Sequence, residues 1–150
     1  MSASREPKVD YLQLEDQLCF ALYAASRAMT AMYAPLLDEL GITYPQYLVL
    51  LLLWSQDGAR VSHLGERLQL DSATLTPLLK RLETRGIVER RRSTADERVV
   101  EVFLTAEGKR LKRRAAEIPL RVFAKTGLTG PELAALRATL QALTRRLREG

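Results

Sequence analysis

The chain has few of the residues from which many protein sites are built: its 150 residues include one cysteine, Cys19, and one histidine, His63. A single cysteine cannot form a disulfide within the chain, which is typical of proteins in a reducing cytosol. One histidine without cysteine or carboxylate ligands at a suitable spacing does not make a metal site. We therefore expect a cytoplasmic protein with no metal and no cofactor.

Long apolar runs are also missing. The longest, YLVLLLLW at 47–54, is far too short to span a membrane. The opening MSASREPKVD lacks the apolar segment of a secretory signal. A composition of 47% hydrophobic and 27% charged residues is typical of a soluble globular protein, and the length favours a single domain over 1–150 with no membrane partner.

The positive charge is concentrated in the middle of the chain. Residues 1–58 carry 3 basic and 7 acidic side chains, whereas residues 59–114 carry 14 basic and 8 acidic ones. Residues 115–150 carry 6 basic and 3 acidic side chains. A polyanion is therefore expected to bind the middle segment, although a solvated basic surface would have the same composition.

Helices are predicted on both sides of that segment. Apolar residues recur at helical spacing from Leu14 to Met32, and Pro35 and LGITYP (40–45) are expected to end this helix and a short successor. A mostly buried helix follows from Gln46 to Trp54. The last helix begins near Thr129, and its leucines at 133, 136, 140, 143 and 147 form an a/d seam that favours a helical partner. We predict dimerisation helices at 12–40 and 106–150.

The segment 59–105 predicts a winged helix-turn-helix. A short helix marked by Val61, Leu64 and Leu68 is followed by the turn LQLDS and a second helix with leucines at 75, 78, 79 and 82. Strands at 87–91 and 99–104 enclose the polar loop RSTADE. The fold class is thus mostly α (α+β). Pro77 leaves two alternatives: the second helix begins early and bends there, or its regular part begins with Thr76 as cap. Pro119 is expected to kink or stop the helix that follows the wing.

The second helix of this unit turns short hydroxyl and basic side chains away from its leucine stripe. Such groups suit base edges and phosphates in a major groove, and an arginine at the tip of a wing can enter a minor groove. Asp96 is placed to brace Arg98 through a bidentate pair. The predicted DNA-binding residues are Ser72, Thr74, Thr76, Pro77, Lys80, Arg81, Arg91, Asp96 and Arg98.

A second stripe runs along the first helix beside the apolar one. Its members all end in a hydroxyl or thiol: Cys19, Tyr23, Ser26, Thr30 and Tyr33. Phenol groups can donate hydrogen bonds to a thiolate and make it a better nucleophile. Tyr23 is one turn from Cys19, but Tyr33 lies about 21 Å further along the axis, so only a second copy could bring it there. The acidic Glu15 and Asp16 oppose a thiolate, so a buried structural thiol stays an open alternative.

The segment DSATLTPLLKRLETRGIVERRRSTADERVVEVFLTAEG resembles the winged helix of MarR-family regulators, whose wing signature corresponds to Asp96, Arg98, Leu104 and Thr105. LEDQLCFALYAASRAMTAMYAPLLDELGITYPQYLVLLLLW is similar to the one-cysteine type of organic hydroperoxide resistance regulators. The resemblance implies a cytoplasmic homodimeric repressor of palindromic operator DNA. It also implies that Cys19 senses peroxide and that Tyr23 and Tyr33 hydrogen-bond the thiolate across the dimer.

The resulting hypothesis is a transcriptional repressor released from double-stranded operator DNA when an organic hydroperoxide oxidises Cys19 to a sulfenic acid. A low-molecular-weight thiol or a cyclic sulfenamide would then trap the acid. One alternative is a MarR-type repressor released by a small phenolic or apolar ligand, with Cys19 structural. Another, a thiol peroxidase, leaves the basic wing unexplained, so we do not expect an enzyme.

Overall fold

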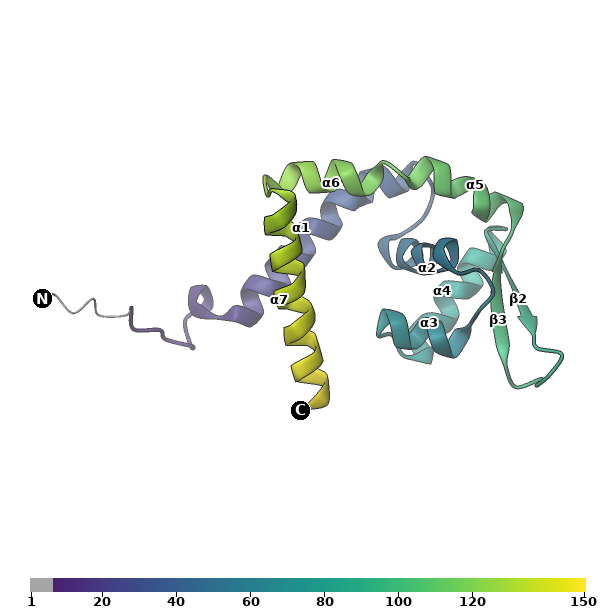
Figure 1. Cartoon of the computed structure of the whole chain (residues 1–150), viewed down its shortest axis with the longest axis horizontal. Helices are drawn as coiled ribbons and strands as arrows, with labels where there is room; N and C mark the ends of the chain where they lie inside the picture. Colours follow the sequence, from purple (N-terminus) through teal and green to yellow (C-terminus); the bar gives the residue numbers. More distant parts are fainter. Residues whose placement is uncertain (1–6) are drawn as a thin grey trace, which may run out of the picture. The chain divides into compact units, whose positions relative to one another are not determined.

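The structure is a computed structural model that describes residues 7–150, and it divides into two compact units, one ending at Ala115 and one running from Ala116 to Gly150 (Figure 1). The elements of the first unit are η1 (Leu14–Asp16), α1 (Leu18–Asp38), α2 (Tyr44–Ser55), β1 (Ala59–Arg60), α3 (Val61–Leu68), α4 (Ser72–Thr84), β2 (Val88–Arg92), β3 (Val100–Leu104) and α5 (Ala106–Ala115). The second unit holds α6 (Ile118–Thr126) and α7 (Gly130–Glu149).

The first long helix differs from its prediction at both ends. A separate 3-10 turn, η1, precedes it, so α1 begins at Leu18. It also continues through Pro35 to Asp38, and the prediction that Pro35 ends it is wrong. A proline inside a helix costs about 3 kcal/mol, but it removes only one hydrogen bond. The next turn buries Leu37, which is 1% exposed, and burial of such a side chain contributes roughly 1.5–3 kcal/mol.

Helix α2 is the centre of the first unit, as its apolar sequence predicted. Thr43 and Gln46 form a capping box, in which the Gln46 N–H donates to Thr43 Oγ1 and the Thr43 N–H donates to Gln46 Oε1. Pro45 lies in the first turn, where its missing N–H has no helical partner to lose. Side chains on several faces of α2 are buried, which is expected of a helix with other elements around it.

The helix-turn-helix consists of α3 and α4, which lie where the leucine spacing predicted two helices. Gln69 ends α3 in the left-handed region, at a φ of 59°. The Asp71 carboxylate then caps α4 by accepting the N–H of Thr74 at 2.8 Å. Since α4 begins at Ser72, Pro77 lies inside the helix, and the alternative start at Thr76 is wrong. The leucines at 75, 78, 79 and 82 are buried, as predicted.

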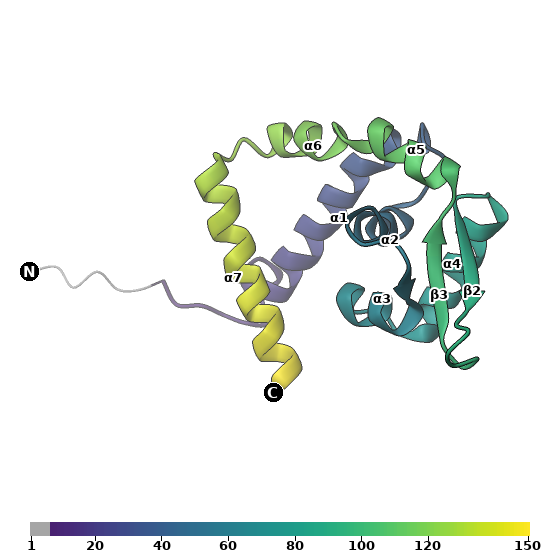
Figure 2. The same cartoon turned by 45° about the vertical axis from the view of Figure 1, so that its right-hand side comes forward.

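The wing hairpin is β2 and β3, each beginning one residue after the predicted start. They pair antiparallel from Val88 opposite Leu104 to Arg92 opposite Val100. A short strand that the sequence did not reveal, β1, pairs with the other side of β3, giving the order β1-β3-β2. In Figure 2 the loop between β2 and β3 extends away from the helices. β2 is therefore an edge strand, with one side open to α4.

The second unit contains two helices separated by a glycine turn. Pro119 lies in the first turn of α6, so the helical path stops after Ala115 and restarts at Ile118 rather than kinking at the proline. α7 begins where predicted, and Thr129 caps it by accepting the N–H of Glu132. No residue of α7 is buried, and the exposed large side chains of its seam are Leu136, Leu140 and Leu147. Within residues 7–150, no helix is both long enough and apolar enough to cross a membrane.

Candidate nucleic-acid interface and thiol site

The polar face of α4 is open to solvent along its length. Its four leucines pack inward, and this orientation leaves the predicted DNA-binding side chains exposed: Ser72, Thr74, Thr76, Pro77, Lys80 and Arg81. The Arg81 Nε donates to the carbonyl oxygen of Pro77 at 3.3 Å, which holds this guanidinium along the helix. The structure thus gathers these six residues on one element.

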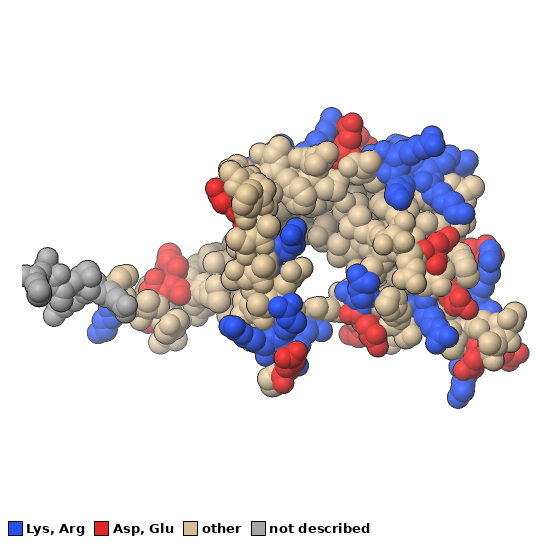
Figure 3. Space-filling view, viewed as in Figure 1, with Lys and Arg blue, Asp and Glu red and all other residues tan. Residues whose placement is uncertain are grey.

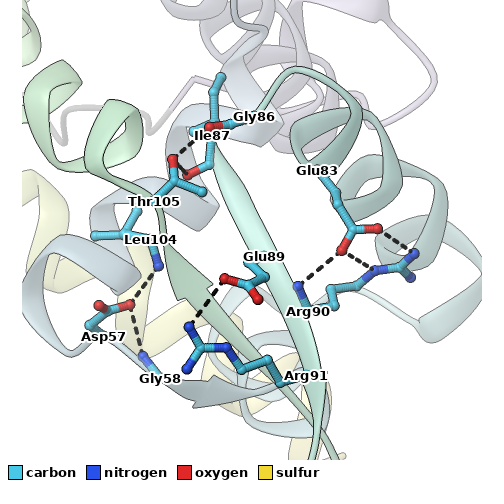
Figure 4. Close-up of polar contacts among 10 residues, drawn as sticks. All are labelled: Asp57, Gly58, Glu83, Gly86, Ile87, Glu89, Arg90, Arg91, Leu104 and Thr105. Carbon is cyan, nitrogen blue, oxygen red and sulfur yellow. Dashed lines mark hydrogen bonds and ion pairs between the residues drawn. The ribbon is translucent and has the colours of Figure 1, made fainter.

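An ion pair connects α4 to the wing (Figure 4). The Arg90 guanidinium, on β2, donates to both carboxylate oxygens of Glu83, at 3.4 Å and 3.2 Å, and the Arg90 backbone N–H donates to Oε2 at 2.9 Å. The hydrogen bonds from the Arg90 side chain hold the pKa of Glu83 below its ordinary value. Because the N–H lies on the open edge of β2, Glu83 satisfies a group that the sheet leaves unpaired. The Arg90 side chain is therefore engaged in a structural contact with α4.

The rest of the wing presents two arginines of different character. The Arg91 guanidinium pairs with Glu89 and lies 4.5 Å from the ring centroid of Phe103, so both an acid and an aromatic ring orient it. Arg98, in the loop, donates from Nε and Nη2 to the two oxygens of Asp96, which confirms the expected bidentate pair. These bonds also hold the pKa of Asp96 below its ordinary value. Arg98 itself is exposed at the loop.

Two side chains fix the base of the wing (Figure 4). Asp57 Oδ1 accepts the backbone N–H groups of Gly58 at 2.9 Å and Leu104 at 2.8 Å, joining the end of β3 to the turn after α2. The Thr105 hydroxyl lies within hydrogen-bond distance of the carbonyl oxygens of Gly86 and Ile87. The wing is thus held to the helix-turn-helix at its base and at Glu83, while its loop is free to contact a ligand.

Cys19 lies in the first turn of α1 and is exposed. The sequence had placed it in a later turn, because η1 was not distinguished from α1. Over the described part of the chain, no residue forms a hydrogen bond with the Cys19 thiol. The free thiol is therefore accessible, and residues 7–150 of the same chain supply no hydrogen-bond donor to it.

The two tyrosines of the thiol stripe lie in different environments. Tyr23 is 59% exposed, and Arg27 holds it: the guanidinium is 5.3 Å from the ring centroid, and Nη1 donates to the phenol oxygen at 3.5 Å. Tyr33 is 8% exposed and packs against Tyr44 and Tyr47 of α2, with ring centroids 5.0 Å and 5.6 Å away. We call Tyr33, Tyr44 and Tyr47 the tyrosine cluster. Cys19 and Tyr33 are not brought together within one chain.

Burial keeps the phenols of the tyrosine cluster protonated. It raises the pKa of Tyr33 and of Tyr44 above the ordinary value, and it raises the pKa of Tyr47 to about 12. A protonated phenol can donate a hydrogen bond at physiological pH. Sequence reasoning missed Tyr44, Tyr47 and Arg27; the spacing of Tyr44 and Tyr47 by one turn in TYPQY was the available signal.

A tight turn joins two helices, the second of which has a polar outer face, and a braced basic hairpin follows them. This arrangement defines the winged helix-turn-helix class of transcriptional regulators. No group of three or more possible metal ligands occurs among residues 7–150. The family described as transcriptional regulator SarA/Rot matches residues 31–115.

Relatives extend the comparison over nearly the whole chain. The organic hydroperoxide resistance transcriptional regulator of Bacillus subtilis is 49% identical over 96% of this chain and 98% of its own length. The regulator TtmR of Methylorubrum extorquens is 48% identical over 93% of this chain and 72% of its own length. The solved structure of reduced AbfR bound to DNA superposes with a TM-score of 0.78 and 36% identity, over 91% of this chain and 93% of that one. AbfR, from Staphylococcus epidermidis, is also known overoxidised on DNA and in a disulfide form.

The chain belongs to the family of organic hydroperoxide resistance transcriptional regulators. This membership confirms the resemblance and the fold class drawn from the sequence. The relatives are regulators, which also confirms the prediction that the chain is not an enzyme.

Proposed function

We propose that two copies of this chain form a repressor that binds operator DNA when Cys19 is reduced and releases it when an organic hydroperoxide oxidises Cys19. The observation that carries the proposal is an exposed thiol in the first turn of a helix, without a hydrogen-bond donor from its own described residues. Family membership favours a sensing role for this thiol over a purely structural role in a core.

The reaction uses the thiolate as nucleophile. The Cys19 sulfur attacks one peroxide oxygen, the O–O bond breaks, and the alkoxide leaves as an alcohol after taking a proton. Cys19 is oxidised to a sulfenic acid and the hydroperoxide is reduced. A small thiol then condenses with the sulfenic acid to give a mixed disulfide and water. Alternatively, a backbone nitrogen displaces water to give a cyclic sulfenamide, since the chain has no second cysteine.

A dimer would cover apolar surface that a single chain leaves exposed. The first residues of the described chain and α1 expose large apolar side chains, among them Tyr11, Leu14, Leu18 and Phe20, and α7 exposes three leucines of its seam. Apolar surface of this extent favours a protein partner. A second copy related by a two-fold axis would cover it and would set two α4 helices about 34 Å apart, the spacing of successive major grooves.

We further propose that Tyr23 and Tyr33 of each protomer donate hydrogen bonds to the Cys19 thiolate of the other, with Tyr33 held by its packing against Tyr44 and Tyr47. Tyr33 is about 21 Å from Cys19 along the same helix, so a contact within one chain is ruled out by length. Arg27 would act through Tyr23, since its hydrogen bond polarises that phenol. Oxidation would break these bonds, and the change in their free energy would shift the paired helix-turn-helix units.

The DNA contacts are assigned by exposure and chemistry. Ser72, Thr74, Thr76, Lys80 and Arg81 would contact the major groove and its phosphates, with Pro77 on the same face. Arg98, braced by Asp96, would enter the minor groove, and Arg91 would contact phosphate.

The test is release of DNA measured by fluorescence anisotropy. An operator duplex is first selected by the reduced protein from a random-sequence pool. Cumene hydroperoxide with a small thiol should release the wild type, whereas Cys19→Ser should stay bound under the same conditions. Continued release of the Cys19→Ser variant would remove the sensing role, and release by a phenolic ligand alone would favour the small-molecule alternative.

The cross-dimer contact is tested with mixed dimers. Tyr33→Phe should slow oxidation of Cys19, measured by intact mass, and Tyr11→Phe is the matched control because Tyr11 is exposed and outside the stripe. A mixed dimer of Tyr33→Phe and Cys19→Ser chains has one Cys19 facing an intact Tyr33 of the other chain. It should react at the wild-type rate per thiol, and a rate equal to that of the Tyr33→Phe homodimer would refute a contact across the dimer.

A further inference from the structure

Helix α5 carries a dense group of cations that the operator-binding face does not use. Its ten residues include five: Lys109, Arg110, Lys112, Arg113 and Arg114. Gly108, Leu111 and Ala115 face inward and are buried, so the cations occupy the solvent side. We call these five residues the α5 patch. In Figure 3, Lys and Arg side chains gather over α5.

Part of the α5 patch has a structural explanation. Arg114 Nη2 donates to the carbonyl oxygen of Glu39 at 3.0 Å, which anchors α5 to the end of α1, and Arg110 pairs with Glu107 at 2.9 Å. Cations in a last turn also stabilise the helix dipole. Lys109 lies outside that turn, and the side chains of Lys109, Lys112 and Arg113 form no hydrogen bond or ion pair with another residue of the described chain. These three side chains therefore have no polar partner there, and the helix dipole alone gives Lys112 and Arg113 a modest structural role.

The α5 patch lies at the far end of the DNA-reading elements. The Thr105 hydroxyl bonds to the carbonyls of Gly86 and Ile87, so α5 begins beside the C-terminal end of α4. The N-terminal end of α4, where the hydroxyl side chains lie, is about 18 Å away along the 13 residues of the helix. The wing strands of five residues separate the start of α5 from the Arg98 loop by about 17 Å. Figure 1 shows α5 and the wing loop at opposite ends of β3.

We propose that the α5 patch binds the phosphate backbone of a second DNA duplex, so that a dimer already on its operator can hold another segment of DNA. Five cations over a helix of about 15 Å give one charge per 3 Å, about half the density of the one negative charge per 1.7 Å along a duplex and opposite in sign. A protein partner is a poorer match, because the described part of α5 exposes no large hydrophobic side chain and interface cores are depleted in lysine.

The experiment captures a second duplex on an occupied dimer. A biotinylated operator, selected by the wild-type protein from a random pool, is immobilised and saturated with reduced protein. A labelled duplex of scrambled sequence is then added. The wild type should retain it at about 50 mM salt. With three phosphates neutralised, binding should weaken about 40-fold on going to about 200 mM, since the logarithmic slope is roughly −0.9 per contact.

The variant removes only the three cations without a structural partner. Lys109→Gln, Lys112→Gln and Arg113→Gln together should abolish capture of the second duplex while leaving the operator affinity unchanged and lowering the melting temperature only slightly. The matched control, Arg121→Gln with Lys125→Gln and Arg137→Gln, removes the same charge from exposed positions after Ala115 and should retain capture.

Three results would overturn the inference. One is a wild-type protein that captures no second duplex at low salt; another is equal loss of capture in the control, which would indicate net charge alone. The third is a parallel loss of operator affinity, which would place the α5 patch on the operator itself. None of these depends on oxidation, so failure here is separable from failure of the peroxide-sensing proposal.

Discussion

The ion pair between Glu83 and Arg90 should couple the recognition helix to the wing, and removing it should destabilise the fold measurably. The perturbation is Glu83→Ala, which deletes the acceptor of three hydrogen bonds from Arg90. One of these comes from a backbone N–H on the open edge of β2. After the substitution, that group and the guanidinium can bond only to water.

The solvent exposure of this ion pair limits the expected loss of stability. The side chains of Arg90 and Glu83 are 29% and 38% exposed, so water replaces much of what is lost. At about 0.5 kcal/mol for each solvent-accessible hydrogen bond, Glu83→Ala should lower the free energy of unfolding by about 1–1.5 kcal/mol. In a double-mutant cycle with Arg90→Ala, the coupling energy should be about 0.5–1 kcal/mol.

The pH dependence of this coupling has a definite sign. Hydrogen bonds from Arg90 hold the pKa of Glu83 in the folded state below its ordinary value of 4.5. A carboxyl group with a lowered pKa contributes stability above its unfolded pKa and loses that contribution as the pH falls through the folded value. The coupling energy should therefore be constant near neutral pH and should decrease below pH 4.5.

The assay is urea unfolding of the four proteins of the cycle, at one protomer concentration because association affects apparent stability. The same proteins are then titrated with the operator duplex, where Glu83→Ala should reduce the effect of Arg98→Gln because the wing is less firmly oriented. A coupling energy of zero at neutral pH, or one that grows on acidification, would refute the argument that this pair joins the wing to α4.

Three further predictions follow from particular contacts. Thr43→Ala removes half of the capping box of α2 and should lower the free energy of unfolding by about 1 kcal/mol, measured by urea unfolding, with Thr43→Ser retaining most of the stability. Arg98→Gln should weaken operator binding by about tenfold and Asp96→Ala by less, because Asp96 only orients the guanidinium; equal losses would contradict this division. The tyrosine cluster should titrate above the ordinary tyrosine pKa, with Tyr47 at about 12 in the ultraviolet absorbance of the folded protein; since raised values favour the protonated folded state, stability should fall as the pH rises from 10 towards 12.

The sequence by itself determined the elements whose pattern is local. Leucines at 75, 78, 79 and 82 oriented α4, and the hydroxyl and basic residues on its other face followed from that orientation. The polar RSTADE loop between two strand-like segments was sufficient for the wing, and the Asp96 to Arg98 spacing was sufficient for its brace. These features depend on residues within one or two turns of each other, so a helical or strand period specifies them.

Tertiary structure decided what depends on distant residues. Pro35 and Pro77 lie inside helices because burial of the leucines that follow them offsets the lost hydrogen bonds. The local preference of proline for helix ends does not include the free energy of that burial. β1 forms only because β3 offers it an edge. Glu83 and Arg90 are seven residues apart, and the turn between them brings them together. The tyrosine cluster unites two helices, and packing rather than spacing buried Tyr33 and left Cys19 exposed.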